Sequence, residues 1–114
     1  MKKKLAAEHI DFADSRYKFF EMTEDSTLTI HMDSWKETPL RIVFAKVIQF
    51  SYKLGDLPKD LYETSGDCPL LMEALASKYE KIPTSHPYKL FELEDIDDFP
   101  FIQIVAVSIN VFKD

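Results

Sequence analysis

Apolar and polar side chains alternate most regularly near residue 30 of this chain. Between positions 26 and 33 every second residue is apolar, namely Leu28, Ile30 and Met32. A period of two predicts a half-buried strand. The preceding segment, 15–22, is rich in aromatic residues and is followed by the polar stretch Thr23-Glu24-Asp25. We therefore expect segments 15–22 and 26–33 to form an antiparallel hairpin.

Two longer segments, 40–52 and 101–112, are apolar at both parities. In the first, one parity holds Leu40, Ile42, Phe44, Ile48 and Phe50, and the other holds Val43, Ala45 and Val47. Strands with this pattern are covered on both faces, so 40–52 is predicted to be one long strand inside the sheet. Segments 88–94 and 101–112 are predicted to be the last two strands, with an acidic turn between them.

A single helix is predicted, beginning at Pro69. Proline favours the first helical position, and Pro83 ends the apolar period of Leu71, Leu75, Tyr79 and Ile82. The segment before it, 54–69, contains both glycines of the chain, and we expect it to be a loop.

The order of these elements predicts an α+β fold. We expect a mainly antiparallel sheet of about five strands, in the sequence order β-β-β-α-β-β, with one amphipathic helix packed on it. The length of 114 residues suits a single domain covering 1–114. Residues 1–13 have no clear period and are predicted to be a loosely ordered N-terminal segment.

Charge and cysteine content exclude several classes of protein. Twenty acidic against 14 basic residues give a formal net charge of −6, and Arg16 and Arg41 are the only arginines, which argues against nucleic-acid binding. No run approaches the ~20 apolar residues of a membrane span. One cysteine, Cys68, forms no disulfide within the chain, and this suits a cytoplasmic location. No motif for a cofactor or phosphate loop is present.

Two features are candidate contacts with a protein partner. The acidic turn holds Glu94, Asp95, Asp97 and Asp98, and its spacing lacks the glycine of a calcium loop, so solvation or contact with a basic protein is expected rather than metal binding. The only tryptophan, Trp35, is the second candidate, because tryptophan is enriched among the residues that dominate interfaces.

His31 and Asp33 form a weaker candidate pair. Two positions apart on a strand, they share one face, which is the arrangement that a metal pair or an oriented imidazole needs. An exposed sheet face carries alternating polar residues in any case, so a structural role is the simpler interpretation.

These observations lead to a non-catalytic, cytoplasmic interaction protein that works as a homodimer. One helix of ~10–12 Å diameter is too narrow for five strands spaced ~4.8 Å apart, so a face with Val43 and Val47 would be exposed unless a loop covers it, the sheet closes or a second copy packs there. One alternative is an immunity or antitoxin type of protein that covers a basic nuclease through its acidic charge. Another is a small metal-dependent hydrolase using His31, Asp33 and the carboxylates of the acidic turn.

Overall fold

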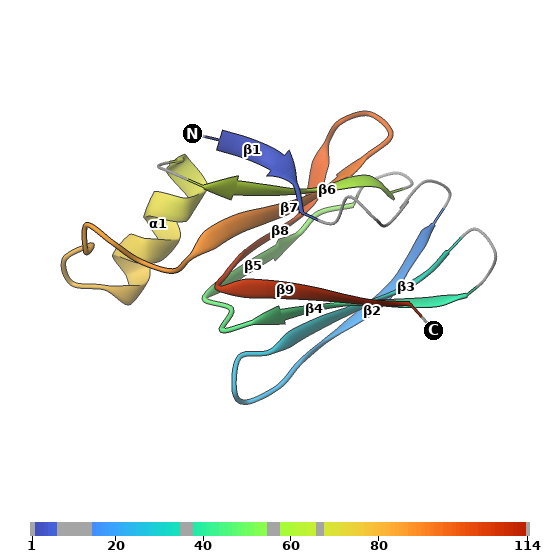
Figure 1. Ribbon diagram of the computed structural model, residues 1–114, viewed down its shortest axis with the longest axis horizontal. Helices are drawn as coiled ribbons and strands as arrows, with labels where there is room; N and C mark the ends of the chain where they lie inside the picture. Colours follow the sequence, from blue (N-terminus) through green and yellow to red (C-terminus); the bar gives the residue numbers. More distant parts are fainter. Residues whose placement is uncertain (1, 7–14, 35–37, 55–57, 66–67, 114) are drawn as a thin grey trace.

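The computed structural model describes residues 2–6, 15–34, 38–54, 58–65 and 68–113. Over these ranges the chain forms nine strands and one short helix, and the strands pair antiparallel in two sheets (Figure 1). The mainly antiparallel architecture with one helix is as predicted, but the strands are divided between two layers instead of forming one sheet of five.

A four-stranded sheet contains the predicted hairpin. Its order is β2-β3-β4-β9, formed by strands β2 (Arg16–Met22), β3 (Leu28–Asp33), β4 (Pro39–Ala45) and β9 (Ser108–Lys113). Along β3 burial alternates strictly, with Leu28, Ile30 and Met32 buried. This confirms the strand that the alternation predicted.

A five-stranded sheet forms the other layer, in the order β1-β6-β7-β8-β5. It contains β1 (Lys2–Leu5), β5 (Gln49–Tyr52), β6 (Pro58–Ser65), β7 (Lys89–Asp95) and β8 (Pro100–Ala106). Part of the N-terminal segment, Lys2–Leu5, thus pairs with β6, whereas residues 7–14 lie outside the described ranges.

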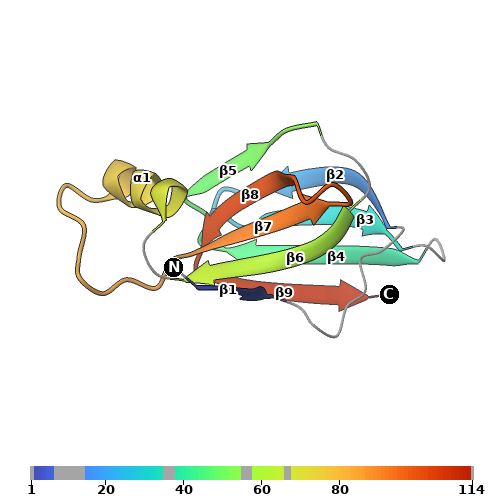
Figure 2. The same cartoon turned by 90° about the horizontal axis from the view of Figure 1, so that it is seen from above.

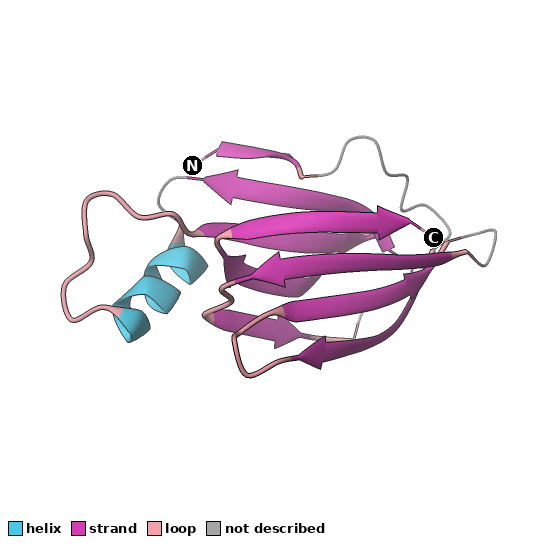
Figure 3. Cartoon of the chain, turned by 60° about the horizontal axis from the view of Figure 1, so that its bottom comes forward, coloured by secondary structure: helices cyan, strands magenta, loops and turns pink. Residues whose placement is uncertain are grey.

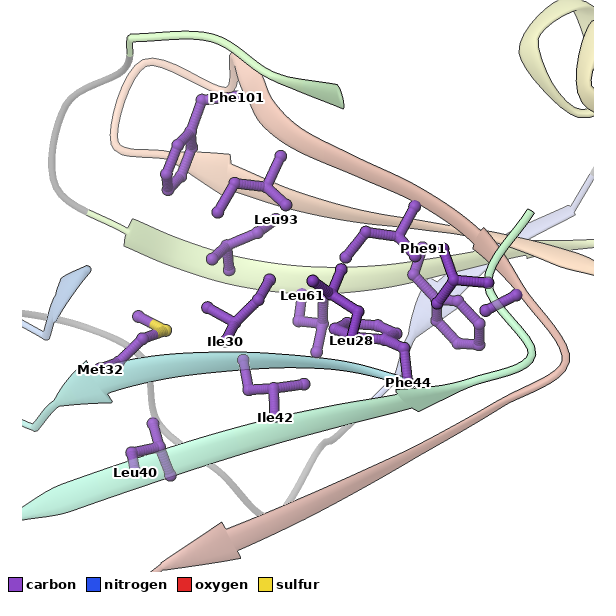
Figure 4. Packing of buried hydrophobic residues seen from close by; sticks show 14 residues of the cluster. Leu28, Ile30, Met32, Leu40, Ile42, Phe44, Leu61, Phe91, Leu93 and Phe101 are labelled. Atoms are coloured by element: carbon purple, nitrogen blue, oxygen red, sulfur yellow. The ribbon is translucent and has the colours of Figure 1, made fainter. Parts of the chain in front are cut away.

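The main hydrophobic core lies between the two sheets (Figure 4). The four-stranded sheet contributes the apolar sides of β3 and β4, and the five-stranded sheet contributes those of β6, β7 and β8. Phe44 and Phe91 meet across this interface with ring centroids 5.4 Å apart. Burying such large rings is a strong driving force for stacking the two sheets.

Two of the connections that carry the chain from one sheet to the other explain the segments that are apolar at both parities. The run 40–52 is not one strand but β4 and β5, separated by residues 46–48, and 101–112 is β8 and β9, separated by Val107. The connections run together: the Val107 N–H donates to the Ala45 carbonyl (3.0 Å), and the Ile48 N–H donates to the Val105 carbonyl (2.9 Å). Each run is apolar at both parities because its two halves belong to different layers and because Ile48, Val105 and Val107 pack in a second apolar cluster outside the main core.

Helix α1 (Pro69–Lys78) lies at one end of the sandwich (Figures 2 and 3). It begins at Pro69, as predicted, and ends before Tyr79. Its buried residues Leu71 and Leu75 pack with Leu90 of β7 and Val105 of β8 in a second apolar cluster. The helix therefore covers one end of the five-stranded sheet's outer face, while the four-stranded sheet covers the inner face.

One expectation from the sequence is wrong, and another, that a face with Val43 and Val47 would be exposed without a covering layer, is resolved within the chain. Segment 54–69 is not only a loop, because Pro58–Ser65 forms strand β6. This strand lies between β1 and β7 in the five-stranded sheet and pairs with both. Val47 is not exposed: it is 7% accessible and belongs to the main core. The covering layer that one helix fails to provide is a second sheet.

Candidate functional site

The acidic turn joins β7 to β8, and its carboxylates have two different environments. Glu94 and Asp95 are buried, at 6% and 3% exposure, whereas Asp97 and Asp98 are exposed. Oδ1 of Asp95 accepts hydrogen bonds from the backbone N–H groups of Asp97 (2.9 Å) and Phe99 (3.0 Å). Asp95 thus holds the turn together, and a partner in solution has access to Asp97 and Asp98.

Nearby lysine charge partly balances the exposed carboxylates. Nζ of Lys59 lies 2.8 Å from Oδ1 of Asp98, and this contact raises the pKa of Lys59. Both side chains are solvated, so the pair contributes little to stability.

His31 and Asp33 lie on the outer face of the four-stranded sheet, and each already has a partner. Nε2 of His31 lies 2.8 Å from Oε1 of Glu21, and its ring stacks on Phe19 with centroids 4.3 Å apart. Oδ2 of Asp33 lies 3.8 Å from Nζ of Lys18. The structure does not combine this pair with the acidic turn, because the turn belongs to the other sheet.

The described part of the chain contains no group of three or more His, Cys, Asp or Glu side chains arranged to hold a metal ion. Trp35, the other candidate contact, lies outside the described residues.

A cluster of half-exposed aromatic residues occupies one long side of the sandwich. Here β2, an edge of the four-stranded sheet, faces β5, an edge of the five-stranded sheet (Figure 2). We call this surface the β2–β5 seam and define it by five residues: Tyr17, Phe20 and Met22 of β2, and Phe50 and Tyr52 of β5.

Rings from the two sheets pair across the seam. The centroids of Tyr17 and Tyr52 are 4.9 Å apart, and those of Phe20 and Phe50 are 4.7 Å apart in an edge-on arrangement. Phe20, Met22 and Tyr52 remain 44%, 47% and 41% exposed. The pairing covers part of each ring but leaves apolar side chains half-exposed on two strands that are edges of their sheets among the described residues.

The seam affects the ionisation of its own tyrosine. Burial, together with the negative charge that Tyr52 acquires at high pH, raises the pKa of Tyr17 above its ordinary value of 10.0. The sequence alone does not reveal this seam, because segments 15–22 and 49–52 become neighbours only through the order of strands in the two sheets.

A shallow pocket of about 210 Å³ opens at the helix end of the sandwich. Its lining comes from the β2–β3 turn, the β4–β5 connection, the end of α1 and the segment before β7: Asp25, Ser26, Lys46, Val47, Ile48, Lys78 and Tyr88. Figure 1 shows that these elements lie at the same end of the molecule.

Comparisons with known proteins identify no relative: no family model, no curated protein and no solved structure matches the chain. Among the described residues no helix has the length and hydrophobicity required to span a bilayer. A function can therefore be inferred only from the structure of the chain itself.

Proposed function

We propose that this protein is a non-catalytic, cytoplasmic interaction module that pairs with a second copy of itself through the β2–β5 seam. The observation that carries the proposal is the set of half-exposed aromatic and methionine side chains on two strands that are sheet edges in the described part of the chain. Aromatic residues and methionine are enriched in interfaces, and apolar surface of this kind favours burial against a partner.

The charges along β2 favour a second copy as the partner. Arg16 and Lys18 stand at the start of the strand, and Glu21, Glu24 and Asp25 stand at its end and in the following turn, all of them exposed. A twofold axis across the strand would place the basic end of one copy beside the acidic end of the other. Such an isologous arrangement is self-complementary and closes as a dimer.

The edge itself argues for contact through side chains rather than through a continued sheet. The pairing of β2 with β3 has a register shift between Tyr17 and Phe19, and Lys18 lies at this irregularity. Bulges and lysines on edge strands oppose the addition of another strand. We therefore expect the rings of two seams to pack together without new backbone ladders.

Sedimentation equilibrium of the full chain across micromolar concentrations tests the proposal. The expected result is a monomer–dimer equilibrium, and Met22→Asp should weaken it about tenfold or more, because it places a charge in the apolar contact. Phe112→Asp is a matched control, since Phe112 is 44% exposed on β9, the far edge of the same sheet. A mass of 13.3 kDa at every concentration would contradict the proposal.

Charge exchange tests the twofold arrangement separately. Arg16→Glu should weaken the dimer, and adding Glu24→Arg should restore it, because the double variant exchanges the two ends of the charge pattern. Failure of the double variant to restore a dimer that Arg16→Glu had weakened would exclude the antiparallel orientation.

A basic protein as partner of the acidic turn is a second candidate, as expected of an immunity or antitoxin type of protein. Exposed Asp97 and Asp98 at the tip support it, together with the half-exposed Ile96 and Phe99 beside them. A salt-sensitive complex with a basic nuclease that is lost in an Asp97→Asn, Asp98→Asn variant, while self-association persists, would favour this function. The arrangement of His31 and Asp33 offers no comparable support for a hydrolase.

A further inference from the structure

We propose that the pocket at the helix end of the sandwich binds a small organic anion, with a carboxylate or phosphate held between Lys46 and Lys78 and an apolar or aromatic body against Val47, Ile48 and Tyr88. This inference does not depend on self-association.

The two lysines of the pocket, Lys46 and Lys78, differ in their ion pairing from several other lysines of the chain. Lys4, Lys18 and Lys89 each lie within 4.0 Å of an acidic side chain. Lys46 and Lys78 form no ion pair with any residue in the described ranges. Both line the pocket although they are far apart in sequence, so the fold brings two lysines that lack an ion pair among the described residues, together with one carboxylate, Asp25, to the same pocket.

The wall that carries Lys46 is fixed by the backbone. Lys46 adopts a left-handed conformation (φ 55°), as does Ser26, another lining residue (φ 65°). The Val47 N–H donates to the Ser26 carbonyl at 2.9 Å and ties the β4–β5 connection to the β2–β3 turn. A non-glycine residue in this conformation is energetically costly and is found more often at functional sites.

The opposite wall positions Lys78. Its Nζ lies 5.7 Å from the ring centroids of both Tyr79 and Tyr88, within the range of a cation–π contact. Tyr88 is itself buried in the cluster beneath α1, so its ring provides a rigid surface. An aromatic body lying on Tyr88 would place its anionic group near the Lys78 ammonium.

Asp25 and the size of the pocket restrict the ligand. The hydroxyl of Thr23 donates to Oδ1 of Asp25, which anchors this carboxylate at the rim. Its negative charge repels a second anionic group, so the pocket favours a ligand with one. A volume of about 210 Å³ is below that of pockets for drug-sized molecules, and this suits a single ring or short chain.

Titration of ¹⁵N-labelled protein, followed by amide chemical shifts, tests the inference. The probes are benzoate, phenyl phosphate and inorganic phosphate, with benzyl alcohol as the uncharged analogue. We expect saturable shifts at Ser26, Val47, Ile48 and Tyr88 with benzoate or phenyl phosphate, and weaker binding of inorganic phosphate, which lacks the ring. Comparison of the first two probes distinguishes a carboxylate from a phosphate ligand.

Three variants complete the experiment. Lys46→Gln and Lys78→Gln should each weaken binding about tenfold, because each removes a charge-assisted contact. Lys53→Gln is the control, since Lys53 is an exposed lysine that does not line the pocket. Three results would each overturn the proposal. The first is an equal effect of all three variants, and the second is tighter binding of benzyl alcohol than of benzoate. The third is a set of chemical shifts that increase linearly with probe concentration, without saturation, near all surface lysines.

Discussion

Asp95, which the sequence suggested as a contact with a protein partner, instead stabilises its own turn. Its buried carboxylate accepts the N–H groups of Asp97 and Phe99, and its own backbone N–H donates to the Phe99 carbonyl at 3.0 Å. The turn also needs a left-handed residue, and Asp98 provides it with φ 61°. Aspartate tolerates this conformation better than most residues other than glycine.

We expect Asp95→Ala to lower the free energy of unfolding by about 2 kcal/mol, because it leaves two N–H groups of a partly buried turn without their acceptor. Urea denaturation measures the change. Asp97→Ala is the matched control in the same turn and should shift stability by less than ~0.5 kcal/mol. Equal losses in the two variants would show that Asp95 does not hold the turn.

Tyr17 gives the seam a signature at alkaline pH. Because burial raises the pKa of Tyr17 in the folded state, folding favours the neutral phenol. The resulting stabilisation is complete below the unfolded pKa and is lost as pH rises through the folded pKa. The protein should therefore lose stability above about pH 10, the ordinary ionisation range of tyrosine.

Tyr52→Phe should lower the pKa of Tyr17 towards its ordinary value, because it removes the second of the two causes of the shift, the charge of Tyr52. Ultraviolet absorbance of tyrosinate across the alkaline range reports the change. Tyr79→Phe, far from the seam in the cluster beneath α1, is the control and should leave Tyr17 unchanged. A pKa of Tyr17 that is the same in both variants would contradict the coupling.

At the scale of elements, the sequence predicts what local patterns determine. The alternation of Leu28, Ile30 and Met32 defines β3, and Pro69 defines the start of α1. The sequence does not predict strand β6, because the strand begins at Pro58 and lies in a segment with both glycines, where turn residues outweigh the strand-favouring residues Leu61, Tyr62 and Thr64. Pairing with β1 and β7 on both sides makes this segment a strand, and that contribution is non-local.

Strand β1 is attached by a charged cluster. Glu63 of β6, with its side chain only 11% exposed, lies 3.3 Å from Nζ of Lys4 in β1 and 3.3 Å from Nζ of Lys89 in β7. One carboxylate thus connects three adjacent strands. Because Glu63 is shielded from solvent, the contact should be stronger than an exposed pair.

We expect Glu63→Gln to destabilise the protein by about 1 kcal/mol and to accelerate hydrogen exchange in β1 more than in β3. Asp98→Asn, which removes the solvated pair with Lys59, is the control and should produce no measurable loss. Uniform acceleration in both sheets would indicate that Glu63 supports the whole fold rather than the attachment of β1.

At the scale of the molecule, the candidate surfaces depend on which strands are edges and which segments meet. The local sequence of residues 15–22 and 49–52 does not indicate that β2 and β5 are edge strands on the same side of a sandwich. The same holds for the pocket. Lys46 and Lys78 both line it because the chain passes from one sheet to the other beside the end of α1. The sequence could predict the aromatic content and the lysines, but their grouping requires the order of strands.

The paired connections at residues 46–48 and Val107 have a consequence for how the protein folds and unfolds. Each connection joins a strand of one sheet to a strand of the other, β4 to β5 and β8 to β9, so neither layer can form without fixing part of the other. The contacts that do so join distant parts of the chain, and such topologies fold slowly, in milliseconds to seconds.

We therefore expect a single cooperative unfolding transition despite the two layers. Urea curves followed by far-ultraviolet circular dichroism and by tyrosine fluorescence should coincide, and hydrogen exchange in β3 and β7 should report the same free energy of opening. A Val107→Pro variant, which removes the N–H that donates to Ala45, should slow refolding if the crossing forms early. The two crossings would then act as the kinetic bottleneck that makes both sheets one folding unit.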